Sequence, residues 1–316
     1  MQMNYEEFCK KMQADLQDYY GEESTVRLQK VNKNNGITLM GITVYEKGVT
    51  IFPTMYLESF YQLYEKQTGY SELVRMFTEK YESYRRDSVN MDFFSDYEKV
   101  KELLFFKLVH YDMNREFLKE VPCHRYLDLA AVFQCHISNE VLGEGTITVR
   151  NEHLKMWHVD TETVYRDALQ NMPLIYPCEF MNMAQMLKKM FEDEEGAIMD
   201  ELPLFVLSNE KRLYGASSLL YQNQLEKIGR LIQDDYYILP SSIHEVLILP
   251  KKYGTDEPEL SRMVYEINQT HVEPEEVLSN HAYFYARGTQ NPVCLPLIPK
   301  NENGCNETEE KQEQVV

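Results

Sequence analysis

The sequence predicts an α+β fold, with mixed or antiparallel sheets and flanking helices. Short apolar runs at strand spacing recur along the chain, and helical patterns lie between them without the strict alternation of a parallel α/β protein. The clearest strand pattern is the segment 236–250, YYILPSSIHEVLILP, in which Pro240 and Pro250 bound two apolar runs. Residues 246–249 are apolar on both alternating faces, which predicts a central strand covered on both sides.

The N-terminal part is predicted to begin with an amphipathic helix and to continue with a hairpin. Phe8, Met12 and Leu16 recur at helical spacing, and Gly21 follows where a helix can end. Two alternating segments then flank the turn-rich residues 32–35. The predicted elements are a helix at 5–19, strands at 25–31, 36–45 and 48–52, and a helical insertion between 53 and 115.

The helical insertion is rich in aromatic residues whose spacing places them on one or two helix faces. They are Tyr61, Tyr64, Tyr70, Phe77, Tyr81 and Tyr84. Packing in a core explains such stripes, whereas an exposed cluster would be a surface for a protein partner.

The C-terminal part returns to a mixture of strands and helices. Strands are predicted at 126–137, 145–149, 204–207 and 282–286, helices at 161–172, 180–191, 217–232 and 258–268, and a helical turn at 274–278. We therefore divide the chain into an N-terminal lobe at 1–115, a C-terminal mixed-sheet lobe at 116–288, and a disordered Pro-rich and acidic tail at 289–316. One continuous core is the alternative.

The charge of the chain argues against nucleic-acid and membrane-surface partners. Lys and Arg total 32 against 51 Asp and Glu, which gives a net charge of -19. The segment 301–316 carries five Glu and one Lys, hence -4, so the remainder carries -15. Such a body repels phosphate backbones and anionic lipids. No apolar run approaches the roughly 18 residues that a membrane-spanning helix needs.

The six cysteines indicate a reducing compartment. They are scattered without any CxxC pair, and the acidic, polar start of the chain does not resemble an export signal. We expect free thiols and a cytoplasmic location. The adjacent pairs Cys123-His124 and Cys135-His136 lack zinc-site spacing, and neighbouring residues in a strand point to opposite faces, so no metal site is predicted.

Three stretches closely resemble a bacterial family known only as a domain of unknown function. They are LSNEKRLYGASSLLY, YYILPSSIHEVLILP and YEINQTHVEPEEVLSNHAYFY, and RYLDLAAVFQ agrees as well. The likeness extends from the first helix to about Arg287. It implies an intracellular bacterial protein and supplies no reaction, ligand or catalytic residue.

The densest polar group beside an apolar run is Ser241, Ser242, His244 and Glu245. One hypothesis is a hydrolase in which Ser241 or Ser242 is the nucleophile and His244 the base, because a hydroxyl needs a neighbouring imidazole to be nucleophilic at neutral pH. No GxSxG motif supports it. The alternative is structural: residues 242–245 have the SxxE form of a capping box around a single helical turn.

A second hypothesis places a small anion or a nucleotide beside Asn209, Lys211, Gly215 and Ser217, where a turn precedes a predicted helix. The GxxxxGK motif of a P-loop is missing, and helix capping is the alternative. The favoured function is a cytoplasmic, non-catalytic binding or regulatory protein with a protein partner and no cofactor. The sequence does not specify its oligomeric state.

Overall fold

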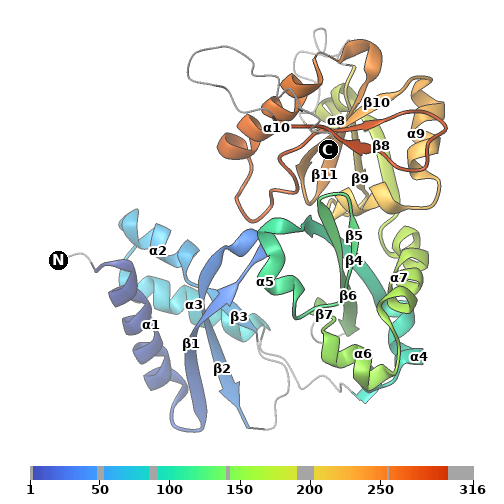
Figure 1. Ribbon diagram of the computed structural model, residues 1–316. Coiled ribbons are helices and arrows are strands. Elements are labelled where there is room, and N and C mark those ends of the chain that lie inside the picture. The colour runs from blue at the N-terminus through green and yellow to red at the C-terminus, as the bar shows by residue number, and fades with distance from the viewer. Residues whose placement is uncertain are drawn as a thin grey trace, which may run out of the picture. The chain divides into compact units, whose positions relative to one another are not determined.

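The computed structural model describes residues 3–47, 53–84, 92–139, 143–190, 203–254 and 256–297 (Figure 1). The chain divides into two compact units, and each unit is made of three separate stretches of the sequence. Unit 1 contains Met1–Phe105, Met113–Pro122 and Phe133–Ala168, and unit 2 contains Phe106–Asp112, Cys123–Val132 and Leu169–Val316. Helices and antiparallel sheets are both abundant, which confirms the predicted α+β class.

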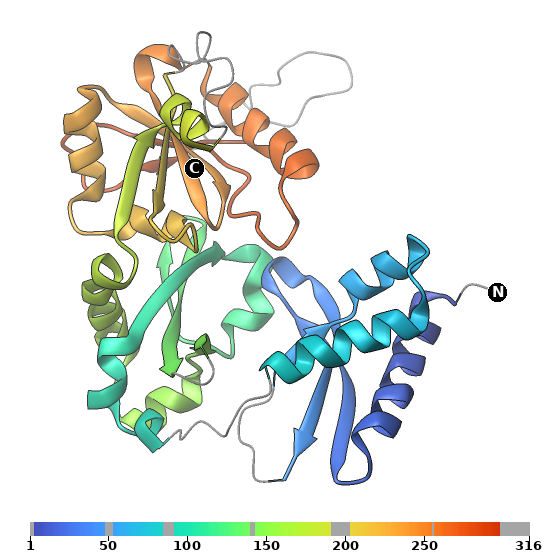
Figure 2. The ribbon, with the colours of Figure 1, turned by 180° about the vertical axis from the view of Figure 1, so that it is seen from behind.

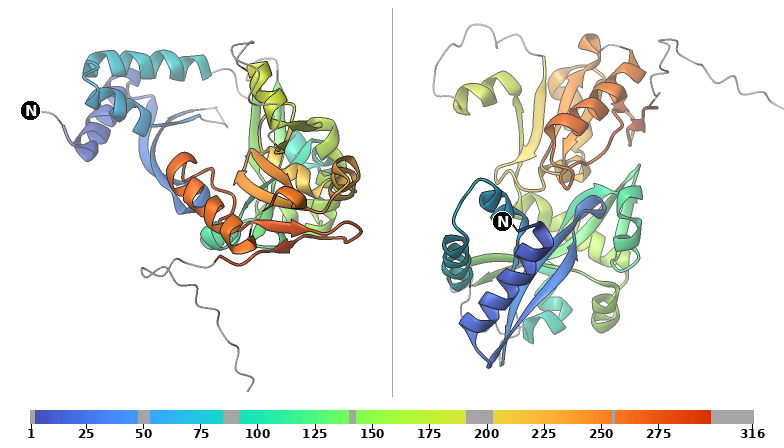
Figure 3. Two further views of the ribbon diagram at one scale, coloured as in Figure 1. Left: turned by 90° about the horizontal axis from the view of Figure 1, so that it is seen from above. Right: turned by 90° about the vertical axis from the view of Figure 1, so that its left-hand side faces the viewer.

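The first part of unit 1 is a three-stranded antiparallel sheet with helices on one face (Figures 2 and 3). Its elements are α1 (Tyr5–Tyr20), β1 (Ser24–Asn32), β2 (Thr38–Glu46), β3 (Thr54–Tyr56), α2 (Glu58–Glu65) and α3 (Tyr70–Tyr84). Asn4 and Glu7 form a capping box that begins α1, and Gly21 lies at its end as predicted. The strand predicted at 48–52 lies outside the described residues.

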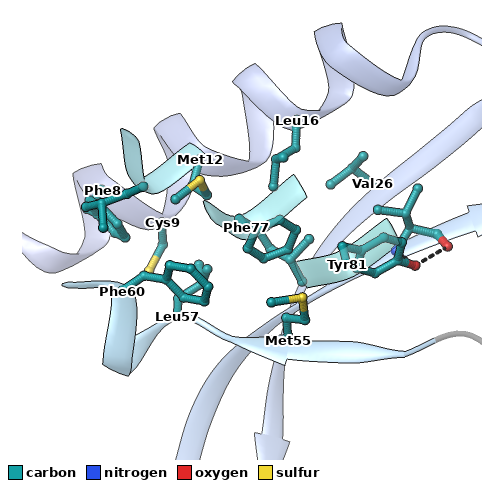
Figure 4. Packing of buried hydrophobic residues seen from close by; sticks show 13 residues of the cluster. Phe8, Cys9, Met12, Leu16, Val26, Met55, Leu57, Phe60, Phe77 and Tyr81 are labelled. Atoms are coloured by element: carbon teal, nitrogen blue, oxygen red, sulfur yellow. Dashed lines mark hydrogen bonds between the residues drawn. The ribbon is translucent and has the colours of Figure 1, made fainter. Parts of the chain in front are cut away.

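A buried cluster of thirteen residues lies between these helices and the sheet (Figure 4). It includes Phe8, Met12 and Leu16 of α1 and Phe77 and Tyr81 of α3, so the predicted helical stripes are core positions. The hydroxyl of Tyr81 donates to the Val44 carbonyl at 3.0 Å, which satisfies the one polar atom that this ring buries. Tyr61, Tyr64 and Tyr70 are partly buried against the same cluster.

The stretch from residue 92 to residue 175, which contributes to both units, corrects one prediction. Residues 104–110 were expected to be helical, yet they form a buried strand, β4 (Leu104–His110). Their LFFKLVH sequence is a short apolar run, which periodicity alone does not separate from a buried helix. The other elements from residue 92 to 175 are α4 (Tyr97–Val100), α5 (Arg115–Leu118), β5 (Cys123–Tyr126), β6 (Leu129–Asn139), β7 (Gly143–Thr148), α6 (Asn151–Trp157) and α7 (Thr161–Ile175). The strands of this stretch are ordered β4-β6-β5, with β7 paired to β6.

Unit 2 is built on a six-stranded antiparallel sheet with the order β13-β12-β10-β11-β9-β8. Its strands are β8 (Cys178–Asn182), β9 (Phe205–Asn209), β10 (Tyr236–Ser242), β11 (Glu245–Pro250), β12 (Tyr283–Tyr285) and β13 (Val293–Cys294). Its helices are α8 (Met183–Met190), α9 (Gln224–Ile232) and α10 (Glu257–His271).

The strand predicted at 246–249 is confirmed as a central strand. It belongs to β11, which lies between β10 and β9. Val246 and Ile248 are fully buried on one face, while Leu247 and Leu249 are partly buried on the other. That second face packs against Leu260 and Val264 of α10. The covering is therefore complete on one side and partial on the other.

Three other predictions need correction. Residues 178–182, partly assigned to a helix, form β8, which pairs with β9. The helix predicted at 217–232 is divided into a 3₁₀ helix, Gly215–Leu220, and α9, because Asn223 has a left-handed φ of 58°. The tail was expected to be disordered from Thr289, yet Val293 and Cys294 pair with β12. Residues 298–316 lie outside the described residues.

None of the helices that the structure describes is long and apolar enough to cross a membrane.

Candidate functional site

The residues singled out around His244 form the turn of a hairpin in unit 2. Ser242 and Glu245 are cross-strand partners of β10 and β11, and Ile243 and His244 make the connection. The Ser242 hydroxyl accepts a hydrogen bond from the His244 amide at 3.1 Å. The predicted single helical turn is thus replaced by a hairpin turn, although the serine hydroxyl still satisfies a backbone donor. We call residues 242–245 the His244 turn.

Two further contacts tie the His244 turn to neighbouring segments. The hydroxyl of Ser208 donates to the His244 carbonyl at 2.8 Å. The Ile243 amide donates to the Glu276 carbonyl at 2.9 Å. These bonds satisfy two polar backbone groups of the turn and hold it against Ser208 of β9 and against Glu276.

The imidazole of His244 also contacts neighbouring residues. Its Nδ1 accepts a hydrogen bond from the Tyr214 amide at 3.2 Å, so the neutral ring carries its proton on Nε2. That Nε2 lies 3.5 Å from Oε1 of Glu276. The ring stacks on Tyr214, with 5.8 Å between the centroids and 14° between the planes. The side chain is 27% exposed, so it is reachable from solvent.

The structure therefore gives His244 a different partner from those the sequence suggested. Glu276 approaches the imidazole, whereas the Ser242 hydroxyl bonds to the backbone of His244 and not to its ring. Glu245 pairs with Ser242 across the hairpin. The side chain of Ser241 lies outside the described residues. Glu276 was missed because it is 32 positions away in the chain, and only tertiary folding brings it to the turn.

The second set of candidates forms the loop between β9 and the 3₁₀ helix. The Asn209 side chain closes this loop by donating to the Leu213 carbonyl at 2.7 Å. Gly215 has no room for a side chain: a Cβ there would lie 2.2 Å from the Ser208 hydroxyl and 2.3 Å from the His244 carbonyl. Lys211 is exposed, with its ammonium 5.3 Å from the centre of the Tyr176 ring.

The backbone amides of this loop are already used. The Ala216 amide donates to the Ile243 carbonyl at 3.3 Å, and the Ser217 amide donates to the Tyr214 carbonyl at 3.1 Å. The Ser217 side chain is fully buried. These two amides donate to carbonyls and are therefore not available to hold an anion.

Sequence reasoning missed a polar cluster centred on Asp128, which we call the Asp128 cluster. The Asp128 carboxylate accepts hydrogen bonds from the Ser279 hydroxyl at 2.6 Å and the Tyr283 hydroxyl at 2.7 Å. Nε2 of His110 lies 3.7 Å from the same carboxylate. Tyr283 and Ser279 are fully buried. These residues belong to unit 2 although they come from three distant parts of the chain.

Burial sets the protonation of this cluster. Burial lowers the pKa of His110, while Asp128 and Asp112 act in the opposite direction and His281 acts with burial. Burial, together with the negative charge of Asp128, raises the pKa of Tyr283 well above its ordinary value. The same two causes raise the pKa of Cys294 to about 11. At neutral pH the cluster therefore holds protonated hydroxyls, a protonated thiol and a neutral imidazole around the carboxylate.

A cavity of about 410 Å³ is the second feature that the sequence did not suggest. It lies in unit 2 between α9 and the end of β12, and it is lined by Glu226, Arg230, Asp235, Tyr285, Arg287 and Gly288. Its volume lies within the range of small-molecule sites, roughly 300–1,000 Å³.

Within the described part of the chain, no group of three or more His, Cys, Asp or Glu residues has a geometry suited to a metal ion. Cys9, Cys123, Cys135, Cys178 and Cys294 are free thiols. Burial raises the pKa of Cys135 to about 12, which makes this thiol unreactive at neutral pH.

The model of a protein family described as a family of unknown function matches residues 5–287, which is most of the chain. No curated protein and no solved structure matches the chain.

Proposed function

The chain belongs to the family of unknown function DUF5688, and we propose that it is a non-catalytic binding or regulatory protein. The proposal rests on the hydrogen bonds made within the His244 turn. The Ser242 hydroxyl and the imidazole Nδ1 of His244 both accept hydrogen bonds from backbone amides, so of the described side chains in this turn neither is arranged to activate the other. A nucleophile and its base need a direct hydrogen bond or one intervening water.

The surface proposed for binding surrounds the same turn in unit 2. His244 and Glu276 are partly exposed, and Lys211 and Leu213 are exposed on the adjoining loop. Arg212 and Tyr214 of that loop have left-handed φ angles of 53° and 54°. Residues other than glycine hold such angles at a cost of about 1–3 kcal/mol, and such strain tends to cluster at functional surfaces.

The setting of this binding protein is part of the proposal. The free thiols fit a reducing bacterial cytoplasm, and the net charge of -19 disfavours nucleic-acid and membrane partners. The tyrosine-rich helices are less suited to binding than the His244 turn, because Phe77 and Tyr81 lie in the core and Tyr61, Tyr64 and Tyr70 are partly buried against it.

The test compares capture of a cellular protein partner by four forms of the full chain. They are the wild type, His244→Ala, Lys211→Glu and, as a control in unit 1, Arg75→Gln, which replaces a residue whose side chain is 63% exposed. We expect one partner, identified by mass spectrometry, to be retained by the control and lost with the first two variants.

The hydrolase alternative is tested on the same proteins. Wild-type turnover of an ester or peptide substrate that His244→Ala and Glu276→Gln both abolish would overturn the proposal, because the imidazole would then act with Glu276 as a base. Capture of the same partner by all four proteins would remove the His244 turn as the binding surface.

A further inference from the structure

We propose that the cavity beside α9 binds a small zwitterion of the amino-acid class, with Arg287 as the residue that receives its carboxylate. The inference rests on the proposed function in one respect, that the protein works by binding. It concerns a different surface from the His244 turn, and the residues that carry it are Gly229, Arg230, Asp235 and Arg287.

The fold positions Arg287 on the face of α9. A Cβ at Gly229 would lie 3.1 Å from Cγ of Arg287 and 3.8 Å from its Cδ, so the arginine stem passes over the glycine in close contact. The Arg287 amide donates to Oδ1 of Asp235 at 2.9 Å, which fixes the backbone at the base of the side chain. A glycine inside a helix costs about 0.5–1 kcal/mol relative to alanine. At Gly229 it permits the close approach of the arginine.

Three of the four charged residues that line the cavity have ion-pair partners. Glu226 forms an ion pair with Arg230, and Asp235 lies 3.5 Å from the ammonium of Lys251. Among the contacts of the described residues, the Arg287 guanidinium forms no ion pair, and its residue is exposed at the cavity. A guanidinium is always charged and presents a planar fork of donors that matches a carboxylate. Arg287 is therefore the group in this cavity that is available to an anion.

The neighbouring acids define the kind of anion. Glu226 and Asp235 line the same cavity as the two arginines, so the wall carries two charges of each sign. A phosphate dianion or a polyphosphate would bring surplus negative charge close to both carboxylates. An amino acid would place its carboxylate on Arg287 and its ammonium beside Glu226 or Asp235, which would then share their negative charge between the ligand and their present partners Arg230 and Lys251. The net charge of -19 disfavours polyanions further.

The experiment is isothermal titration calorimetry of the full chain with each standard amino acid at millimolar concentration, and with propionate and inorganic phosphate as comparison probes. We expect at least one amino acid to bind, and propionate and phosphate to bind more weakly than it does. Arg287→Gln should weaken that binding by about 10- to 100-fold, the loss that follows removal of hydrogen bonds between charged groups.

Two variants separate the site from a general effect on folding. Gly229→Ala should also weaken binding, because its methyl group displaces the Arg287 stem, while thermal denaturation shows a folded protein. Arg75→Gln removes the same charge from an exposed position in unit 1 and should leave binding unchanged. A folded Gly229→Ala protein that binds as the wild type does would contradict the assigned role of Arg287.

Three results would overturn the inference. They are the absence of heat from every amino acid, equal binding of phosphate or propionate, and binding that survives Arg287→Gln. None of them bears on the partner capture through the His244 turn, so this inference can fail while the proposed function stands. Turnover that depends on His244 would remove the proposed function and leave the calorimetry to decide the cavity.

Discussion

At the scale of single residues, the Asp128 carboxylate joins three segments of unit 2. It lies in the tight turn between β5 and β6, after Leu127, whose φ is 56°. Its partners Ser279 and Tyr283 come from the segment that enters β12, and His110 comes from the end of β4. Hydrogen bonds to a charged group contribute about 1.5–3 kcal/mol each, more than bonds between neutral groups. The cluster should therefore matter to stability out of proportion to its size.

Replacing Tyr283 by phenylalanine tests this contribution. The variant Tyr283→Phe removes one hydroxyl donor and leaves the Asp128 carboxylate with Ser279 in a buried setting. We expect the free energy of unfolding in urea to fall by about 1.5–3 kcal/mol. Tyr253→Phe is the matched control, because Tyr253 is 51% exposed, and its change should stay within about 0.5 kcal/mol. Equal effects of the two variants would contradict the role of the Asp128 cluster.

The His110 imidazole predicts how stability responds to pH. Its pKa in the folded protein is lowered from the ordinary 6.5, so the unfolded chain binds more protons around and below that pH. The stabilising contribution is present in full well above pH 6.5, the pKa of the unfolded chain, and is lost as the pH falls through that value towards the lower pKa of the folded protein. We expect the midpoint of urea unfolding to decrease between about pH 7.5 and pH 5.5.

His110→Gln should flatten part of this pH dependence. It will not remove all of it, because burial also lowers the pKa of His153 in unit 1. A pH dependence as steep in His110→Gln as in the wild type would show that the imidazole near Asp128 does not titrate in this range.

At the scale of elements, the hairpin of β10 and β11 organises unit 2. Ile248 of β11 is fully buried and pairs with Ile238 of β10 on one side and Phe205 of β9 on the other. The edge strand β13 contains Val293, which is 63% exposed. The same type of substitution should therefore have very different effects in the two strands.

Ile248→Ala is expected to lower the free energy of unfolding by about 2–5 kcal/mol, through lost burial and the cavity left behind. Val293→Ala, at the edge of the same sheet, should change it by less than about 0.5 kcal/mol. Chemical denaturation followed by circular dichroism measures both. A small effect at Ile248 would contradict its place in the centre of the sheet.

The close approach of Gly215 to the His244 turn gives a further prediction. A methyl group there meets Ser208 Oγ and the His244 carbonyl at 2.2 and 2.3 Å, and the latter belongs to the backbone. Gly215→Ala should destabilise the protein by about 1–3 kcal/mol or more, because the hairpin must shift to admit it. Gly145→Ala is the control, since nothing lies within 4 Å of a Cβ at that position. Thermal denaturation of the two variants distinguishes a crowded glycine from a free one.

At the scale of the whole molecule, the first core is formed by one continuous stretch of the chain, whereas unit 2 combines separate stretches. All thirteen buried residues of the core in Figure 4 lie between Phe8 and Tyr81, so this core is complete within one stretch of sequence. Unit 2 instead takes Phe106–Asp112 and Cys123–Val132 from the middle of the chain. The predicted boundaries at 115 and 288 remain a proposal.

Fragments test this difference. We expect residues 1–84 to unfold cooperatively in urea, because their core needs no later segment. A fragment of residues 169–316 lacks His110 and Asp128, and should show no cooperative transition. Cooperative unfolding of 169–316 would indicate that the Asp128 cluster is dispensable, and its absence in 1–84 would contradict an independent N-terminal core.

The sequence alone determined the features that depend on local pattern. The helical spacing of Phe8, Met12 and Leu16 identified α1, because one face of that helix is buried. The continuous apolar run at 246–249 identified the central strand, because both faces of such a strand are covered. Both signals lie within a few turns or pleats of the chain.

Only the tertiary structure decided which polar groups meet. Glu276 approaches His244 from 32 positions away, and Tyr283 reaches Asp128 from 155 positions away. Arg287 crosses α9 at Gly229 because the end of β12 lies beside that helix. A hydrogen bond between distant residues leaves no periodic trace in either segment. The hairpin form of the His244 turn, the Asp128 cluster and the cavity therefore could not be predicted from the sequence.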